Sequence, residues 1–127
     1  MAKNQIVLLD TNILIGILRK DQKVISTFSA LSWDDLFIST ITYGEIIIGA
    51  RKGELQKTKR FLKSFGIIEL DKHISIRLRE IYHEAYYHQG LLADAIIGAT
   101  AVTYDLPIWT TNKTDFNYIS GLRFFKA

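Results

Sequence analysis

Cysteine is absent from the 127-residue chain. This absence excludes zinc–thiolate sites, disulfide bonds and thiol catalysis, and it is compatible with a reducing cytoplasm. Proline occurs once, at Pro107, and no linker rich in Pro, Gly or Ser, internal repeat or low-complexity segment interrupts the chain. Hydrophobic residues make up 48% and charged residues 23%, the balance of a folded protein. The length and this balance predict a single domain over residues 1–127.

Long apolar runs are also missing. The stretch 6–18 is rich in Ile and Leu, but Asp10, Thr11 and Asn12 interrupt it. A secretory signal needs an unbroken apolar region, and a membrane-spanning helix needs about 20 apolar residues. Neither pattern is present, so we expect no membrane association and a cytoplasmic location.

Several catalytic and nucleotide-binding motifs do not occur. The sequence contains no P-loop, no G-x-G-x-x-G and no G-x-S-x-G, so nucleotide-cradling and serine-hydrolase interpretations have no support. The histidines His73, His83 and His88 fall on one predicted helix, where only His83 and His88 are loosely related in spacing. We interpret all three as surface residues.

Short apolar runs alternate with segments of helical periodicity. Strands are predicted at 6–9, 36–39, 67–70, 107–110 and 122–125. Helices are predicted at 21–31, at 45–51 with an end at Gly53, and along the apolar stripe Leu55–Phe65. A long helix is predicted from a cap at Asp71 to a terminal Gly90, followed by a helix at 93–104 and a helical turn at 115–119. The alternation predicts an α/β fold, with a parallel sheet covered by helices on both faces.

Four acidic residues lie where an apolar run gives way to polar residues or to a new helix: Asp10, Glu45, Asp94 and Asp115. Parallel α/β proteins build their active sites at the carboxyl ends of strands. Carboxylates that converge there repel one another, by roughly 4 kcal/mol for each close pair at an effective dielectric of about 20. A divalent cation removes this repulsion. The pattern therefore predicts a hard-metal site, and the chemistry such a site supports is phosphodiester hydrolysis.

Each acid also has a purely structural interpretation. Asp10 or Thr11 can cap the following helix, and Thr42–Glu45 matches the S/T-x-x-E capping box. Asp94 opens an apolar helix, where aspartate commonly caps, and Asp115 lies in a polar turn, where hydrogen bonding to the local backbone is usual. No single acid indicates a site. Their shared position at element boundaries favours one.

The formal net charge is +3, and the pI is about 9.2. Six of the sixteen basic residues fall within thirteen positions, with only Glu54 against them: Arg51, Lys52, Lys57, Lys59, Arg60 and Lys63. Such a cluster binds phosphates or forms an ordinary solvated helix face. Beside a metal site, it favours a nucleic acid partner.

With these positions in hand, the chain resembles the PIN-domain nucleases, and within them the VapC toxins of toxin–antitoxin pairs. The resemblance covers nearly the whole chain, through Leu9–Leu14, Ile38–Ile46 followed by Gly49, Ala93–Ala101, and Leu106–Phe116. It implies a three-layer α/β fold with a short central parallel sheet flanked by helices. It also implies an endoribonuclease that depends on Mg²⁺ or Mn²⁺.

The resemblance assigns roles to the acids. Asp10, Glu45 and Asp94 are implied to be catalytic and to bind the metal. For the fourth catalytic and metal-binding position we favour Asp115. The alternative is Asn112, which stands where some members carry an acidic residue and would act as a neutral ligand or position a water. The resemblance further implies that Asn12 and Thr111 orient the carboxylates.

The resemblance also implies partners. These are an RNA substrate, either tRNA or ribosomal RNA, a small cognate antitoxin, and a second copy in a homodimer. We predict the dimer contact at Tyr82–Tyr87, because Tyr is enriched at interface cores. Two alternatives stay open: a PIN nuclease of RNA processing or decay with no antitoxin, and a non-catalytic RNA-binding module. A phosphatase with an aspartyl nucleophile is disfavoured, because it needs an acid where Asn12 stands.

Overall fold

A four-stranded parallel sheet forms the centre of the computed structural model, which describes residues 5–126. In the order β3-β2-β1-β4, its strands are Gly66–Ile68, Leu36–Ser39, Val7–Leu9 and Ile108–Trp109. All three residues of β1 are buried. This is expected of an inner parallel strand with helices on both faces, and it explains why the strands appear in the sequence as continuous apolar runs.

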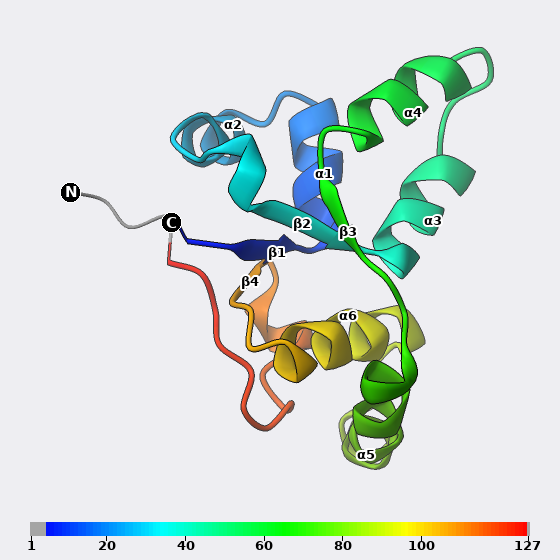
Figure 1. Cartoon of the computed structure of the whole chain (residues 1–127), viewed down its shortest axis with the longest axis vertical. Helices are drawn as coiled ribbons and strands as arrows, with labels where there is room; N and C mark the ends of the chain where they lie inside the picture. The colour runs from blue at the N-terminus through cyan, green and yellow to red at the C-terminus, as the bar shows by residue number, and fades with distance from the viewer. Residues whose placement is uncertain (1–4, 127) are drawn as a thin grey trace.

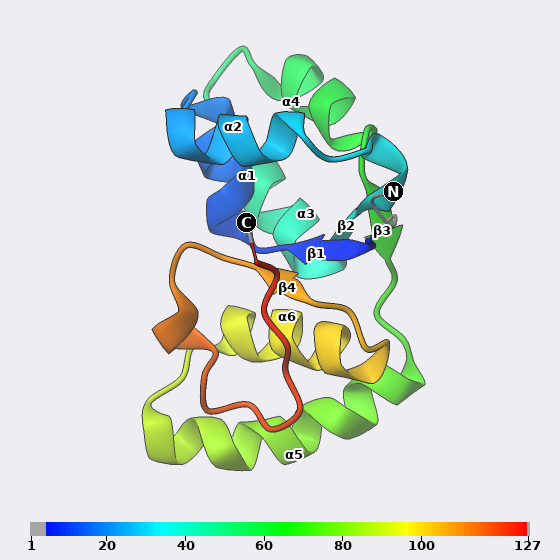
Figure 2. The same ribbon diagram turned by 90° about the vertical axis from the view of Figure 1, so that its left-hand side faces the viewer.

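Helices cover both faces of the sheet (Figures 1 and 2). On one face lie α1 (Thr11–Leu18), α2 (Gln22–Ser29), α3 (Thr40–Ile48) and α4 (Leu55–Leu62), and on the other lie α5 (Lys72–His88) and α6 (Leu92–Thr103). Val7 and Leu9 pack into the core beneath the first layer, whereas Leu8 packs into the core beneath the second. This alternation follows from the two-residue period of a strand. The predicted three-layer α/β fold is confirmed.

The start of α3 differs from the sequence-based prediction. The helix begins at Thr40, not at Glu45, and ends at Ile48, so that Gly49 rather than Gly53 follows its last turn. Its N-cap is Ser39, whose hydroxyl accepts a hydrogen bond from the backbone N–H of Thr42. The capping-box interpretation of Thr42–Glu45 is therefore wrong. Glu45 lies inside the helix.

Other elements also differ from the prediction. Gln89, with φ of 53°, occupies the left-handed position after α5 that we predicted for Gly90. The final predicted strand contributes only a single bridge, between Ile108 and Phe124. The helical turn predicted at 115–119 is a 3₁₀ turn, η2, that spans Lys113–Asp115. No helix within the described residues is long and apolar enough to cross a lipid bilayer.

Candidate functional site

Three of the four predicted acids come from positions that follow adjacent strands. Asp10 directly follows β1, Glu45 lies in the helix that follows β2, and Asp115 ends the turn that follows β4. Asp94 joins them from the first turn of α6. The negative charges of the other three acids all raise the pKa of Asp94. The four carboxylates are therefore close enough for their charges to act on one another.

Asp10 is the most buried of the four, with 3% of its surface exposed. It occupies the N-cap position of α1, but its side chain makes no capping hydrogen bond. Instead, Thr110 donates its hydroxyl to Asp10 Oδ2 over 2.8 Å, and the backbone N–H of Asn112 donates to that hydroxyl over 3.0 Å. Burial raises the pKa of Asp10, and the Thr110 hydrogen bond partly opposes the rise. The Asp10 carboxylate is therefore held by Thr110 and does not act as a helix cap.

Glu45 is held from the start of α1. The hydroxyl of Thr11, which is buried, donates to Glu45 Oε1 over 2.7 Å. Glu45 is otherwise exposed, so this hydrogen bond and not burial defines where its carboxylate lies. Its second oxygen, Oε2, is left for another partner.

Asp94 differs from the other acids because no side chain within residues 5–126 donates a hydrogen bond to it. The N-cap of α6 is Leu91, and the carboxylate of Asp94 takes part in no capping hydrogen bond. Desolvation raises the pKa of Asp94 to about 6, with further contributions from the charges of Asp10, Asp115 and Glu45. The capping interpretation of Asp94 is not supported.

Asp115 and Asn112 form a hydrogen-bonded pair. The Asn112 amide donates to Asp115 Oδ2 over 2.8 Å, while the hydroxyl of Thr114 donates to the Asn112 carbonyl over 2.8 Å. The charge of Asp115 raises the pKa of both Asp10 and Asp94. The Asp115 carboxylate is therefore near enough to act on two of the other acids, and Asn112 donates a hydrogen bond to it.

Comparison with known proteins now decides the family, since residues 7–122 match the model of the PIN domain. The chain belongs to the PIN-domain family. It is 29% identical to ribonuclease VapC of Rickettsia bellii, over 91% of each chain. Over 94% of this chain and 86% of the relative, it is 29% identical to ribonuclease VapC1 of Methanocaldococcus jannaschii. A chain of a toxin–antitoxin complex from Klebsiella pneumoniae is 33% identical, with a TM-score of 0.77 and coverage of 91% and 94%. The predicted family is confirmed.

Two residues that hold acids in this PIN domain were missed in the sequence, each by one position. We predicted that Asn12 and Thr111 orient the carboxylates, but both are exposed, and Thr11 and Thr110 make the hydrogen bonds instead. Successive residues of an extended strand point to opposite sides, and successive helical residues are about 100° apart. Only one member of each adjacent polar pair can therefore face the site. For Thr11 the sequence offered one signal, its position directly after Asp10. For Thr110 it offered none, because Thr110 and Thr111 are the same residue type side by side.

The donor set of the PIN site fits a hard divalent cation. All four candidate ligands are carboxylates, the type that Mg²⁺ and Mn²⁺ prefer. The ion pairs found among the described residues, Arg77–Glu80 and Arg123–Asp105, include none of them. Within residues 5–126, no three acidic or histidine side chains lie close enough to hold one ion together. The acids are gathered without a positive partner, an arrangement whose mutual repulsion a cation would relieve.

A groove of about 660 Å³ leads away from Glu45 between α1, α3 and α4. Its apolar lining includes Ile15, Ile46 and Phe61, and Arg51 and Lys57 line it as well. All six predicted basic residues are exposed, on α4 or beside it. We call these six residues, Arg51, Lys52, Lys57, Lys59, Arg60 and Lys63, the basic surface. Two of its residues, Arg51 and Lys57, line the groove, and Glu45 is the one site acid that also lines it.

Proposed function

We propose that this protein is an endoribonuclease that depends on Mg²⁺ or Mn²⁺ and acts as the toxin of a toxin–antitoxin pair. The observation that carries the proposal is the convergence of four carboxylates that lack a basic partner among the described residues, within a PIN domain. The relatives from Rickettsia bellii and Methanocaldococcus jannaschii are both named ribonucleases. With RNA as the substrate, we expect the activity in the cytoplasm.

In this proposal Asp10 and Asp94 would hold the principal cation, and Glu45 and Asp115 would move closer to complete the site when it binds, because no three of these side chains are close enough to hold one ion in the metal-free protein. Asp10 and Glu45 each accept a threonine hydroxyl on one carboxylate oxygen, and their carboxylates would supply negative charge and oxygen ligands to the cation. When bound, the cation lowers the pKa of a coordinated water and stabilises negative charge on the phosphate. Hydrolysis adds water across the bond between phosphorus and the 3′ oxygen. The products are a 5′-phosphate and a 3′-hydroxyl.

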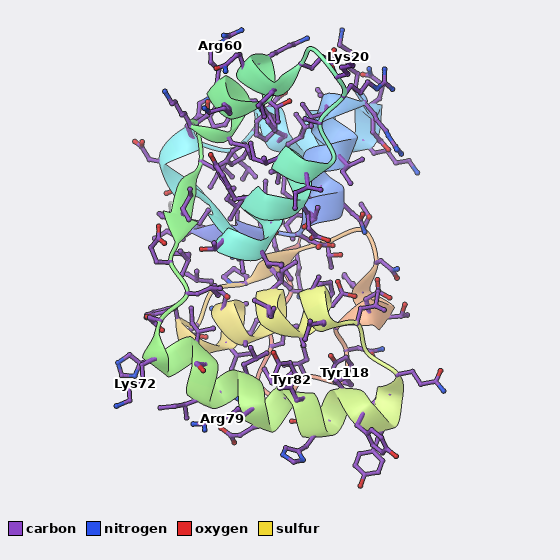
Figure 3. The ribbon with its side chains drawn as sticks, turned by 90° about the vertical axis from the view of Figure 1, so that its right-hand side faces the viewer. Lys20, Arg60, Lys72, Arg79, Tyr82 and Tyr118 are labelled. Atoms are coloured by element: carbon purple, nitrogen blue, oxygen red, sulfur yellow. The ribbon has the colours of Figure 1, made fainter. Side chains whose placement is uncertain are left out.

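The basic surface is proposed to bind the RNA backbone. Lys and Arg side chains neutralise phosphates without regard to sequence, so they position the strand rather than select it. Arg51 and Lys57 line the groove that also includes Glu45, which gives a strand held there a path to the acids. Arg60 lies at the same end of the molecule as Lys20 (Figure 3). We propose a structured RNA, tRNA or ribosomal RNA, as the substrate.

The same groove is proposed to receive the antitoxin. Its apolar lining includes the side chain of Leu18, which is exposed in the described structure. An apolar antitoxin segment would fill it, and a basic side chain of that segment would reach Glu45 and replace the charge of the cation. The related Klebsiella pneumoniae chain comes from a toxin–antitoxin complex.

We further propose that the protein is a homodimer that uses the Tyr82–Tyr87 region. Tyr86 and Tyr87 are 79% and 81% exposed, a large aromatic area for a protein surface. Sedimentation equilibrium of the wild type and of a Tyr86→Ser, Tyr87→Ser variant tests this. A wild-type monomer at micromolar concentration contradicts it.

The function itself is tested by cleavage of tRNA and ribosomal RNA with Mg²⁺, with EDTA, and after Asp10→Asn. We expect cleavage in the first condition only. Asp34→Asn is the matched control, because it removes one exposed acid outside the site. RNA binding without cleavage in any metal would favour the non-catalytic module. Cleavage without growth arrest on expression, and without a small inhibitory neighbour gene, would favour a nuclease of RNA processing.

A further inference from the structure

Three buried hydroxyls connect the end of β2 to the carboxylate of Glu45. Thr11 Oγ1 lies 2.7 Å from Glu45 Oε1 and 3.0 Å from Thr42 Oγ1, and Ser39 Oγ lies 3.4 Å from Thr42 Oγ1. Ser39 and Thr42 are completely buried. We call these three residues, Ser39, Thr42 and Thr11, the hydroxyl chain.

The hydroxyl chain has a single direction. A hydroxyl carries one hydrogen, and an ionised carboxylate only accepts, so Thr11 donates to Glu45. Thr11 therefore has no hydrogen left for Thr42, and Thr42 must donate to Thr11. Ser39 in turn donates to Thr42, while its oxygen accepts the backbone N–H of Thr42 over 3.2 Å. Each hydroxyl is thereby satisfied as both donor and acceptor.

Glu45 needs such a support more than Asp10 does. Asp10 is buried and has a short side chain, whereas Glu45 is exposed and has one more rotatable bond. Burial cannot hold its carboxylate in place. Hydrogen bonds in a chain polarise one another, so each donation towards Glu45 strengthens the next.

We propose that Thr42 and Ser39 are positioning residues for the cation site and act on Glu45 through Thr11. The hydroxyl chain holds Oε1 and presents Oε2 as the one oxygen that Glu45 offers to the cation. This inference rests on the proposed function. It assigns a role to two side chains that touch neither RNA nor cation, at positions set by the buried junction of β2 with α3.

The test compares Thr42→Val, which keeps the shape and removes the hydroxyl, with Thr42→Ser, which keeps the hydroxyl. Thr100→Val is the matched control, because Thr100 is also completely buried but donates to the carbonyl of Ile96 within α6. Two quantities are measured against Mn²⁺ concentration: the rise in melting temperature and the rate of RNA cleavage. In the metal-free protein, NMR measures the exchange rate of the Thr11 hydroxyl proton, which we expect to be slow because the side chain is buried and donates to Glu45.

We expect Thr42→Val to raise the Mn²⁺ concentration needed for both effects by about three- to tenfold. This lies at or below the lower end of the range for residues that orient a ligand directly. Thr42→Ser and Thr100→Val should leave it within about twofold of the wild type. The Thr11 hydroxyl proton should exchange faster in Thr42→Val only.

An unchanged Mn²⁺ dependence in Thr42→Val, with a fall in melting temperature like that of Thr100→Val, would overturn this inference alone and show a structural role. A wild-type protein that Mn²⁺ neither stabilises nor activates would overturn the proposed function, and this role with it. The hydroxyl proton separates these cases from a misfolded variant, because its exchange is measured without metal.

Discussion

Two parts of the acidic site are built in different ways. Asp10, Glu45 and Asp115 each accept a hydrogen bond from a neutral side chain, whereas Asp94 has no such support from a side chain. Its place depends on how the backbone at the start of α6 packs. Asp10, Glu45 and Asp115 are thus held in place before a cation binds, whereas the charge of Asp94 is left uncompensated.

The largest expected effect follows from this difference. Asp94→Asn should abolish RNA cleavage while the fold survives, because the variant removes a full charge and keeps the side-chain size. It should also stabilise the metal-free protein at pH 7.5. A raised pKa means that folding favours the protonated form of Asp94. The stability that this preference contributes to the wild type is complete below the unfolded pKa of 3.8 and is lost as the pH rises through about 6.

The gain at pH 7.5 should be about 1 kcal/mol, after discounting for the partial exposure of Asp94. Urea unfolding of metal-free protein at pH 7.5 and pH 5 measures it, and the gain should shrink at the lower pH. Clear destabilisation by Asp94→Asn at pH 7.5 would contradict the view that the charge of Asp94 is uncompensated. It would favour the interpretation of Asp94 as a helix cap.

Glu45→Gln should affect function strongly and stability little. Thr11 can still donate to the amide oxygen, so the side chain stays in place while its charge is lost. We expect most of the cleavage activity to disappear and the melting temperature to stay within about 2 °C of the wild type, a shift that corresponds to less than about 0.5 kcal/mol. Glu54→Gln, which alters another acid that lines the groove, is the control. Wild-type turnover by Glu45→Gln would remove Glu45 from the catalytic set.

Asp94 depends on the backbone at the start of α6, and the packing of the turn before that helix can be tested at Gly90. A Cβ on Gly90 would meet the Tyr118 hydroxyl at 2.6 Å and its ring at 3.0 Å, and the Tyr118 ring stacks on His88 at 5.3 Å between centroids. Gly90→Ala should therefore destabilise the protein by about 1–3 kcal/mol, as overpacking does. Differential scanning calorimetry measures the loss.

Tyr118→Leu combined with Gly90→Ala provides the control, because it removes the ring and hydroxyl that the new methyl group meets. We expect the double variant to be more stable than the sum of the two single changes predicts. Additive effects would show that the glycine is needed for another reason than the approach of Tyr118.

Gly90 also shows where sequence reasoning succeeds and where it stops. Buried parallel strands and long helices are recognisable from apolar runs and periodicity, and these predicted the layers of the fold and the acids that follow the strands. A glycine after a helix is usually interpreted by its backbone freedom. Here Gln89 adopts the left-handed conformation instead. Position 90 needs a residue without a side chain because Tyr118, 28 positions away in the sequence, packs against it.

For the site, too, the sequence predicted the acids but not the side chains that hold them. Spacing placed Asp10 and Asp94 at element boundaries, but it could not tell Thr11 from Asn12 or Thr110 from Thr111 as their neighbours. That choice depends on which side chain faces the sheet edge, and thus on packing between distant segments. Likewise, both Ser39 and Thr42 are suitable N-caps, and only the length of β2 decides that the helix starts after Ser39.

The smallest expected effect concerns the basic surface, where charges act at a distance from the acids. Lys57→Gln with Arg60→Gln should weaken RNA binding and reduce its salt dependence, by about 0.7 in the log–log slope for each single-strand phosphate that is no longer neutralised. Lys72→Gln with Arg79→Gln removes the same charge from α5, at the opposite end of the molecule from Arg60 (Figure 3). Filter binding at several salt concentrations compares the pairs. An equal weakening in both would show that net charge alone attracts the RNA, whereas a weakening confined to the first pair identifies the groove side as the path of the strand.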